Sequence, residues 1–212
     1  MQGRERLSGC SHTVLPDRIE AATYLAAAAI TGGSIIVHTC PGHLAAPIAV
    51  LRRMGCQIQT KERSIALQAP KRLMGAGSLV TLPYPGFPTD LQAIFMSLAA
   101  AADGFTALTE TVFPRRWAHV EELRRMGADI TVAGNHAVVC GAPLSGSALT
   151  CTDLRAGAAV VLAALAAMGE STVTAVSHIE RGYADFVPTL RALGGNITLT
   201  EVSNPPKEVL SP

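Results

Sequence analysis

A motif that ends in glycine recurs three times in this chain, and the recurrence limits the folds that the chain can adopt. The copies are LRRMGCQI, LRRMGADI and LRALGGNI, which begin at Leu51, Leu123 and Leu190. An acidic residue precedes each of three alanine-rich runs, at Asp17, Asp90 and Asp153. A glycine closes each run, at Gly32, Gly104 and Gly169. Three markers in one register predict a single supersecondary unit that is used three times.

The pattern within each unit predicts a helix, a strand, a second helix and two further strands. The first helix is nearly all apolar, which indicates burial, and its copies are PDRIEAATYLAAAAI, PTDLQAIFMSLAAAA and CTDLRAGAAVVLAALAAM. A β-branched strand follows in SIIVHT, TALTETV and STVTAV. The repeated LR motif ends the second helix, and alternating strands come last in QIQT, IALQ, DITVA, AVVC and NITLT. This alternation of helices and strands predicts an α/β domain with buried first helices.

The ends of the predicted helices carry capping signals. Residues with cap chemistry begin the three first helices, namely Asp17 with Glu20, Thr89 with Gln92, and Thr152. A glycine just past a last turn can adopt the positive φ that helix ends favour. Because Asp17, Asp90 and Asp153 hold similar places in the three units, we expect capping to be part of the role of each.

Composition narrows the classes of function. The chain has 212 residues, of which 49% are apolar, and this is enough for one large domain or two small ones. The net charge of +1 and the lack of a long basic run argue against a nucleic-acid partner. The longest apolar stretch, about 156–168, is too short to span a bilayer and predicts a buried helix rather than a membrane segment.

The cysteines and histidines predict neither a disulfide framework nor a metal site. Five unevenly spaced cysteines, with no signal peptide before them, fit a reduced, cytoplasmic chain. His38, Cys40 and His43 supply three candidate ligands without a fourth in phase, so we expect no zinc site. Cys151 lies near the acidic Asp153, which disfavours a reactive thiolate.

Several long segments resemble the family of UDP-N-acetylglucosamine enolpyruvyl transferases. The most specific is TLPYPGFPTDLQ from Thr81, and the others are VLPDRIEAATYL, TETVFPRRWAHVEELRRMGA, LSGSALTCTDLRAGAAVVLA and HIERGYADFVPTLRALGGNI. The resemblance implies an α/β domain in which three βαβαββ-type repeats form one inside-out, barrel-like body. We expect an interdomain passage at 1–13, a domain at 14–200 and a loose tail at 201–212, with repeats of about 14–80, 81–143 and 144–200.

The same resemblance implies a reaction and its partners. Family members move the enolpyruvyl group of phosphoenolpyruvate onto the 3-hydroxyl of UDP-N-acetylglucosamine with loss of phosphate, the first committed step of peptidoglycan synthesis. No metal or organic cofactor is implied. A family member is about twice as long as this chain and carries a Lys-Asn pair and a Cys or Asp loop in its N-terminal domain. We therefore expect that domain as the missing partner, and no turnover by this chain alone.

Two residues are expected in the chemistry itself. By resemblance, Asp90 accepts a hydrogen bond from the sugar 3-hydroxyl and takes its proton. Arg181, in HIERGY, contacts phosphoenolpyruvate, as suits a guanidinium that donates paired hydrogen bonds. The alternatives are a plain helix cap for Asp90 and a surface ion pair of Arg181 with Glu180 or Asp185.

Five further residues are expected to bind substrate. By resemblance, Asp153 and Arg155 lie at the cleft, where they form a local pair that orients substrate groups, and the alternative is a helix cap plus a salt bridge. The backbone near Val112 and Phe113 is expected to contact the uracil and ribose, with Arg116 close behind, and the alternative is a buried strand end.

Two other functions remain open at this point. A shikimate-pathway enolpyruvyl transferase shares the repeat architecture, although TLPYPGFPTDLQ and HIERGY favour the nucleotide-sugar enzyme. The chain is otherwise a non-catalytic, truncated domain that binds the nucleotide sugar weakly.

Overall fold

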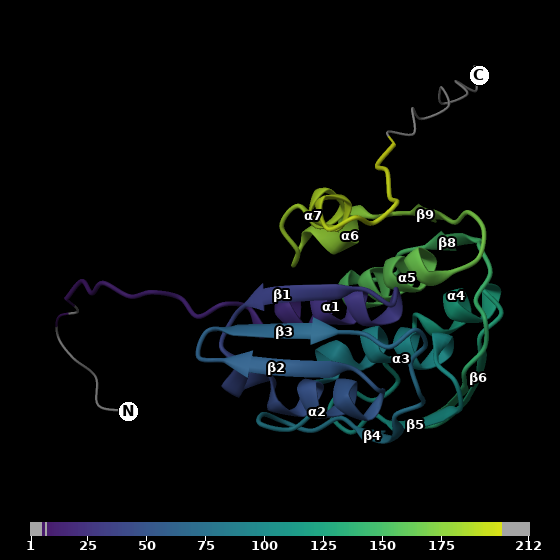
Figure 1. Ribbon diagram of the computed structural model, residues 1–212, viewed down its shortest axis with the longest axis horizontal. Helices are drawn as coiled ribbons and strands as arrows, with labels where there is room; N and C mark the ends of the chain where they lie inside the picture. The colour runs from purple at the N-terminus through teal and green to yellow at the C-terminus, as the bar shows by residue number, and fades with distance from the viewer. Residues whose placement is uncertain (1–5, 7, 201–212) are drawn as a thin grey trace, which may run out of the picture.

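Three apolar helices form the centre of the molecule, whose computed structural model describes residue 6 and residues 8–200 (Figure 1). They are α1 (Arg18–Ile30), α3 (Gln92–Ala101) and α5 (Leu154–Ala166), and they pack against one another. Ser97 of α3 donates a 2.8 Å hydrogen bond to the backbone oxygen of Ala159 in α5. Small side chains let the helices approach closely, and the predicted buried helices are confirmed.

The first unit surrounds α1 with a sheet and an outer helix. Its antiparallel sheet has the order β1-β3-β2 and covers α1 in Figure 1. The bounds are β1 Ser34–His38, β2 Gln57–Lys61 and β3 Ser64–Gln68, with the short 3-10 helix η1 at Pro41–Leu44 and α2 at Ala45–Arg53. All three predicted strands and both predicted helices of this unit are present.

The second unit repeats this arrangement with one more strand. Its sheet has the order β4-β5-β7-β6, in which β4 and β5 are parallel and the other pairs are antiparallel. The bounds are β4 Gly77–Val80, β5 Phe105–Thr109, α4 Val120–Arg125, β6 Asp129–Ala133 and β7 His136–Cys140. The period-two pattern did not indicate β4, which pairs with β5 and thereby joins the second sheet.

The third unit is the least regular. It contains the parallel pair β8 (Ala148–Thr150) and β9 (Thr172–Thr174), followed by α6 (Ser177–Glu180) and α7 (Phe186–Ala192). The predicted strand NITLT is wrong, because residues 196–200 form no strand. A strand needs a ladder partner for its backbone groups, and none of the described strands pairs with this segment.

The predicted caps are confirmed at Asp17 and wrong at Thr152. Asp17 Oδ1 accepts from the backbone N–H groups of Ile19 and Glu20, at 2.7 and 3.2 Å. At the third inner helix the cap is Asp153, one residue after Thr152. The glycines that follow the helices have positive φ, as predicted, at Gly32, Gly55, Gly104, Gly127, Gly169 and Gly194.

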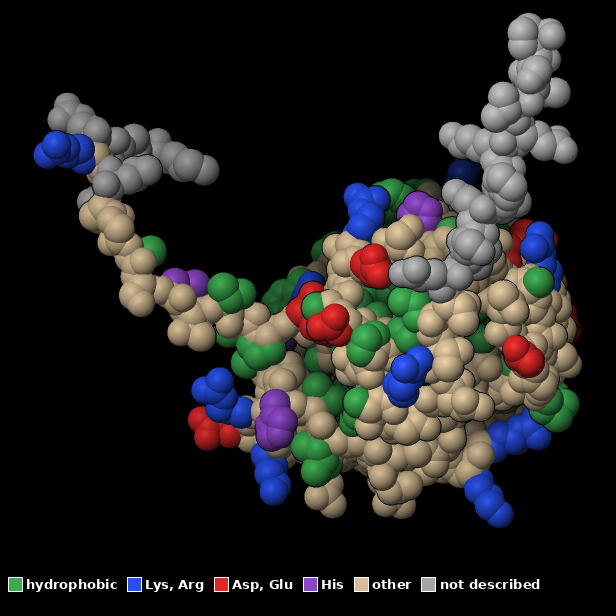
Figure 2. Space-filling model, turned by 90° about the horizontal axis from the view of Figure 1, so that it is seen from above, with side chains coloured by type: hydrophobic (Ala, Val, Ile, Leu, Met, Phe, Trp, Pro, Cys, Tyr) green, Lys and Arg blue, Asp and Glu red, His purple; other side chains and the backbone are tan. Residues whose placement is uncertain are grey.

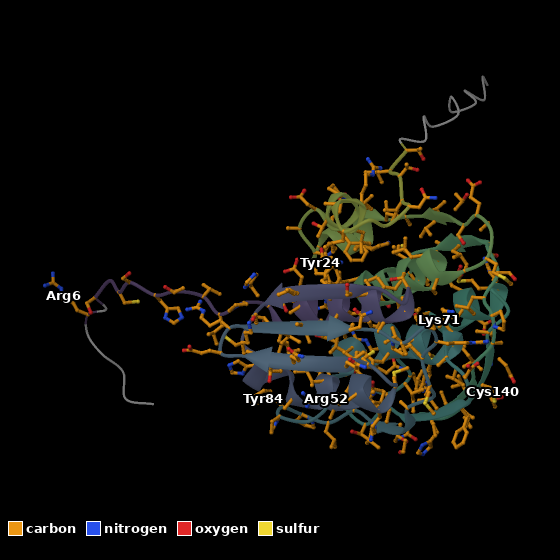
Figure 3. The ribbon with its side chains drawn as sticks, viewed as in Figure 1. Arg6, Tyr24, Arg52, Lys71, Tyr84 and Cys140 are labelled. Carbon is orange, nitrogen blue, oxygen red and sulfur yellow. The ribbon has the colours of Figure 1, made fainter. Side chains whose placement is uncertain are left out.

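Contacts between the third and first units close the molecule into one body. The ring of Tyr24 in α1 lies 6.2 Å from that of Phe186 in α7, and Figure 3 labels Tyr24 just below α6 and α7. The hydroxyls of Thr23 and Tyr183 lie 2.9 Å apart. The observed α/β architecture therefore matches three repeats arranged around shared inner helices.

The outer surface and the chain ends add three observations. The expected tail at 201–212 lies outside the described residues, as do residues 1–5 and 7 of the expected passage, and the repeat bounds stay predictions. On the face drawn in Figure 2, Lys and Arg side chains lie apart from one another. No helix in the described part of the chain has the length and apolarity needed to cross a membrane.

Candidate active site

The three inner helices run parallel, so their N-termini meet at one end of the molecule. Asp90 and Arg155, which begin the second and third inner helices, contact each other there. The opposite ends meet at a cavity of about 250 Å³ that is lined by Ile30, Ala101 and Ala166. Figure 3 places Lys71, which also lines that cavity, far from Tyr84, which belongs to the loop before Asp90. The carboxylates of Asp17 and Asp153 cap two of these N-termini, whereas the N-terminus of α3 carries no side-chain cap and so favours an anion near Asp90.

Asp90 differs from the other two repeated acids because it caps no helix. A single 3-10 turn, η2 (Thr89–Leu91), precedes α3, and neither element has a side-chain cap. The expected capping role of Asp90 and the predicted Thr89–Gln92 capping box are therefore both wrong. Because the extra turn places Asp90 inside a helical turn instead of before it, its carboxylate points away from the free backbone N–H groups. The side chain remains 41% exposed.

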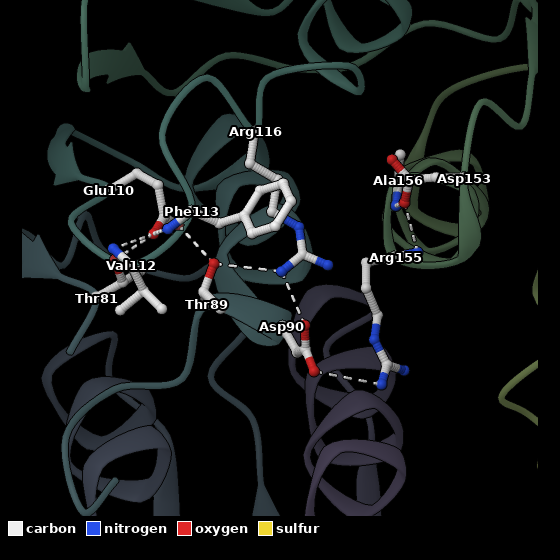
Figure 4. Close-up of polar contacts among 10 residues, drawn as sticks. All are labelled: Thr81, Thr89, Asp90, Glu110, Val112, Phe113, Arg116, Asp153, Arg155 and Ala156. Atoms are coloured by element: carbon white, nitrogen blue, oxygen red, sulfur yellow. Dashed lines mark hydrogen bonds and ion pairs between the residues drawn. The ribbon is translucent and has the colours of Figure 1, made fainter. Parts of the chain in front are cut away.

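Two arginines from different units hold the Asp90 carboxylate (Figure 4). Nη1 of Arg116, in the loop after β5, donates to Oδ1 at 2.8 Å. Nη2 of Arg155, in the first turn of α5, lies 3.6 Å from Oδ2. The side chains of Arg116 and Arg155 are only 21% and 12% exposed, so the carboxylate of Asp90 is the most solvent-exposed of the three groups. We call Asp90, Arg116 and Arg155 the acid–arginine trio.

Asp153 and Arg155 do not form the expected local pair. Asp153 Oδ1 accepts from the backbone N–H groups of Arg155 and Ala156, at 2.8 and 2.9 Å. Its capping task therefore leaves the guanidinium of Arg155 to reach Asp90. This arrangement is the alternative of a cap plus a salt bridge, with the bridge made to another unit.

Residues 182–183 pack close to the start of α5, and Tyr183 contacts the guanidinium of Arg155. The guanidinium carbon lies 5.3 Å from the centre of the Tyr183 ring, which is buried. Gly182 packs against Leu154, and an added Cβ there would lie 2.7 Å from a methyl carbon of that leucine. Burial raises the pKa of Tyr183, so its hydroxyl stays neutral. Nη1 of Arg155 is buried and has no hydrogen-bond partner among the described residues.

A buried glutamate organises the loops that carry the trio. Glu110 is fully buried and accepts four hydrogen bonds. Oε1 accepts from the Thr81 hydroxyl at 2.7 Å and from the N–H groups of Val112 and Phe113 at 2.9 Å each. Oε2 accepts from the Thr89 hydroxyl at 2.9 Å. The loops before Asp90 and after β5 are thus tied to one carboxylate.

Val112 and Phe113 are not a buried strand end. Strand β5 stops at Thr109, and the two residues are 40% and 62% exposed. The Phe113 ring lies 5.5 Å from the guanidinium carbon of Arg116, beside the trio. Because their N–H groups already donate to Glu110, the backbone can offer a ligand only carbonyl oxygens here.

A neutral histidine lies behind the site. Burial lowers the pKa of His119 to about 4, because the charged imidazolium would lose its hydration. Its Nε2 lies 3.1 Å from Sδ of Met96 in α3. The neighbouring charge of Asp153 raises this pKa and that of Arg116 lowers it, which places the ring close to the trio.

The structure does not bring Arg181 into the trio. It follows α6, its side chain is exposed, and no ion pair joins it to a described residue, including Glu180 and Asp185. His43, from the three-residue ligand candidate, instead places Nδ1 3.0 Å from the Tyr84 hydroxyl. Within residues 6 and 8–200, no three His, Cys, Asp or Glu side chains gather as metal ligands.

Sequence reasoning missed three residues that build the site, namely Thr89, Glu110 and Tyr183. A signal existed for Glu110, because Thr106 and Leu108 are buried on β5 and the period of two continues to residue 110. For Tyr183 the signal was its place within HIERGY, beside a glycine. For Thr89 the capping-box spacing predicted Gln92 as the partner, whereas its hydroxyl donates to Glu110.

Comparisons with known proteins match this chain to enolpyruvyl transferases. The family model described as EPSP synthase (3-phosphoshikimate 1-carboxyvinyltransferase) matches residues 1–190. The UDP-N-acetylglucosamine 1-carboxyvinyltransferase of Magnetococcus marinus is 49% identical over 199 residues, which are 93% of this chain and 48% of that protein. The protein of the same description from Finegoldia magna is 47% identical and is covered to 48% by 95% of this chain.

A solved structure agrees in fold. The enolpyruvyl transferase NikO from Streptomyces tendae superposes with a TM-score of 0.78 at 29% identity, over 87% of this chain and 44% of that one. This chain therefore spans about half the length of the curated relatives it matches. From the matched model, the repeated units and the shared fold, the chain belongs to the EPSP synthase family of carboxyvinyl transferases.

Proposed function

We propose that this chain forms one wall of an active site that transfers the enolpyruvyl group of phosphoenolpyruvate to the 3-hydroxyl of UDP-N-acetylglucosamine. The observation that carries the proposal is the uncapped carboxylate of Asp90, held by Arg116 and Arg155 and open to solvent on one side. A carboxylate fixed in this way can accept a hydrogen bond from a sugar hydroxyl and take its proton as the oxygen attacks. The names of the relatives support the choice of substrates.

The reaction has two stages, an addition and an elimination. This chain acts on the attacking sugar oxygen in the addition. The sugar oxygen bonds to the central carbon of phosphoenolpyruvate, while the methylene carbon of phosphoenolpyruvate gains a proton. The carbon–oxygen bond to phosphate then breaks, and the methyl carbon returns a proton, so that the enol ether forms. Asp90 receives the hydroxyl proton in the addition step. The two arginines keep the carboxylate in one orientation, which lowers the entropy lost when the hydroxyl aligns.

Anionic groups of the substrates are expected near the same end of the molecule. The guanidinium groups of Arg116 and Arg155 are donors suited to a phosphate or carboxylate oxygen, and the uncapped N-terminus of α3 adds positive potential. Arg181 is exposed and unpaired among the described residues, so its guanidinium is free to contact phosphoenolpyruvate. These contacts suit a substrate that carries both a phosphate and a carboxylate.

The nucleotide end is expected over the exposed loop at Val112 and Phe113. Their N–H groups are used by Glu110, so the backbone carbonyls can accept hydrogen bonds, for instance from the N–H of a uracil or a ribose hydroxyl. The exposed side chains supply an apolar surface beside them. Because this loop offers only hydrogen-bond acceptors from its backbone, a nucleotide that binds here must present hydrogen-bond donors.

The chain alone is proposed to bind without turning over. It spans about half the length of its relatives, and we propose that the remaining part supplies the acid that protonates phosphoenolpyruvate and the surface that excludes water. We also propose that the whole protein acts in the cytoplasm in peptidoglycan synthesis.

Calorimetric titration of the 212-residue chain with UDP-N-acetylglucosamine and with shikimate 3-phosphate tests the proposal. We expect binding of the nucleotide sugar only, and a loss of about tenfold or more in affinity for Asp90→Asn, from one charge-assisted hydrogen bond. Asp103→Asn is the matched control, because Asp103 follows the other end of α3 and also pairs with an arginine, Arg72, at 2.9 Å.

Three results would argue against the proposal. Preference for shikimate 3-phosphate would identify the other branch of the family as the function. Equal affinity of the Asp90 and Asp103 variants would remove Asp90 from the site. Release of phosphate by the isolated chain would show that the second half is not required.

A further inference from the structure

Glu110 is a buried carboxylate that lies outside the acid–arginine trio and is surrounded by hydrogen-bond donors. A fully buried carboxylate is rare in proteins, because its charge is expensive to remove from water unless donors surround it. Here four donors do so, and they come from two loops, one with Thr81 and Thr89 and the other with Val112 and Phe113. The first loop leads into Asp90 and the second leads into Arg116. The carboxylate thus joins the two segments whose ends meet at the site.

The direction of one hydroxyl connects Glu110 to the trio. An ionised carboxylate only accepts hydrogen bonds, so the single proton of the Thr89 hydroxyl points toward Glu110 Oε2, 2.9 Å away. The lone pairs of that hydroxyl then face Nη1 of Arg116, which donates to it at 3.2 Å. The same Nη1 donates to Asp90 at 2.8 Å. Figure 4 shows this continuous chain from Glu110 through Thr89 and Arg116 to Asp90.

We infer that Glu110 is a positioning residue, which fixes Arg116 and through it Asp90 by setting the direction of the Thr89 hydroxyl. With the hydroxyl oriented, both protons of Arg116 Nη1 have acceptors, so the guanidinium has one favoured position. Without it, Arg116 keeps its bond to Asp90 but loses the second anchor. The inference rests on the proposed function, because it assigns Glu110 to the site that binds the sugar.

The sharpest perturbation is Glu110→Gln, which keeps the shape and reverses one contact. The amide oxygen can keep the three bonds to Thr81 and to the N–H groups of Val112 and Phe113. The amide NH₂ replaces Oε2 and donates toward Thr89, so the hydroxyl must turn its proton elsewhere. Local backbone structure is retained, while the Thr89 hydroxyl gives one lone pair to the amide and is no longer held with both lone pairs toward Arg116.

The first measurement is the NMR spectrum of the unliganded 212-residue chain. We expect Glu110→Gln to leave the protein folded, with Val112 and Phe113 amide signals near their wild-type positions. The guanidinium signal of Arg116 should shift, and its protons should exchange several-fold faster with water. Glu122→Gln is the matched control, because Glu122 is also buried and accepts a backbone N–H, from Thr150, outside the chain of contacts. It should leave the Arg116 signal unchanged.

The second measurement is a double-mutant cycle with Thr89→Val, which removes the hydroxyl and keeps the side-chain shape. We expect about a fivefold to tenfold loss of affinity for UDP-N-acetylglucosamine in each single variant, or about 1–1.4 kcal/mol. Because both changes break the same link, the double variant should lose little more. A structural defect unrelated to Thr89 would add to the loss in the double variant.

An unchanged Arg116 signal in a folded Glu110→Gln protein overturns the inference, as do additive losses in the cycle. If Glu110→Gln fails to fold, the test is made with Thr89→Val alone. An unchanged Arg116 signal in the Thr89→Val protein would also overturn the inference. If wild-type chain binds no UDP-N-acetylglucosamine, the proposed function fails, while the ligand-free Arg116 signal still tests the positioning role.

Discussion

Acid should weaken this fold through His119, and the size of the effect follows from its burial. The ring is 1% exposed, and burial lowers its pKa from 6.5 to about 4. An unfolded chain therefore binds a proton at this residue in the window between those values, and the folded chain does not. More protons bound by the unfolded state mean that the free energy of unfolding falls as pH decreases. The contribution is fully present above pH 6.5 and is lost as pH falls toward 4.

The magnitude follows from the two pKa values. A pKa that falls from 6.5 to about 4 corresponds to about 3 kcal/mol of stability, of which about 2 kcal/mol is lost between pH 7 and pH 5. This is a large share of the roughly 5–15 kcal/mol that holds a typical domain folded. Protonation also places a cation beside Arg116, which should loosen the acid–arginine trio.

Urea unfolding at pH 7, 6 and 5 measures this contribution. His119→Gln removes the titrating group, so its free energy of unfolding should fall by about 2 kcal/mol less than that of wild type between pH 7 and pH 5. Subtracting the two curves cancels the carboxylates common to both proteins. His136→Gln, at an exposed histidine of β7, controls for the loss of an imidazole as such. Parallel pH profiles for wild type and His119→Gln would refute the reasoning.

Two further substitutions test a contact between two units and the packing within one unit. Tyr183→Phe removes the hydroxyl that meets Thr23 at 2.9 Å and should cost about 1 kcal/mol in urea unfolding; no loss would mean that this contact does not join the third unit to the first. Gly141→Ala should cost about 2 kcal/mol or more, because the added Cβ would lie 1.7 Å from the backbone oxygen of Ala102. Gly42→Ala, where an added Cβ meets nothing within 4 Å, is the control, and equal stability of the two alanine variants would contradict the packing argument.

The framework of the fold could be predicted because the repeats carry redundant local signals. A long, apolar, alanine-rich run can satisfy its backbone groups within itself as a buried helix, and the glycines after each helix have the positive φ that their places require. The strand expected at 196–200 failed because alternation describes a side-chain pattern, whereas a strand also needs a partner. Likewise β4 was missed, since a short segment of four residues shows its identity mainly through its pairing with β5.

The site could be predicted only in part, for a similar reason. Asp90, Arg116 and Arg155 were all expected near the cleft, but local spacing suggested that Arg155 pairs with Asp153. The observed pair joins residues from two units, and no sequence pattern reports that distance. The difference between Asp90 and the two capping acids depends on one 3-10 turn, which the repeat register conceals. Glu110 acts through hydrogen bonds that exist only once both loops are in place.

The most direct test of the central claim is a crystal structure of this chain with UDP-N-acetylglucosamine bound. We expect the sugar 3-hydroxyl oxygen at about 2.6–3.2 Å from a carboxylate oxygen of Asp90. Arg116 and Arg155 should keep their contacts with the same carboxylate, and the nucleotide should lie against the carbonyls of the loop at Val112. A sugar bound with its 3-hydroxyl turned away from Asp90, or a nucleotide bound at another end of the inner helices, would contradict the account.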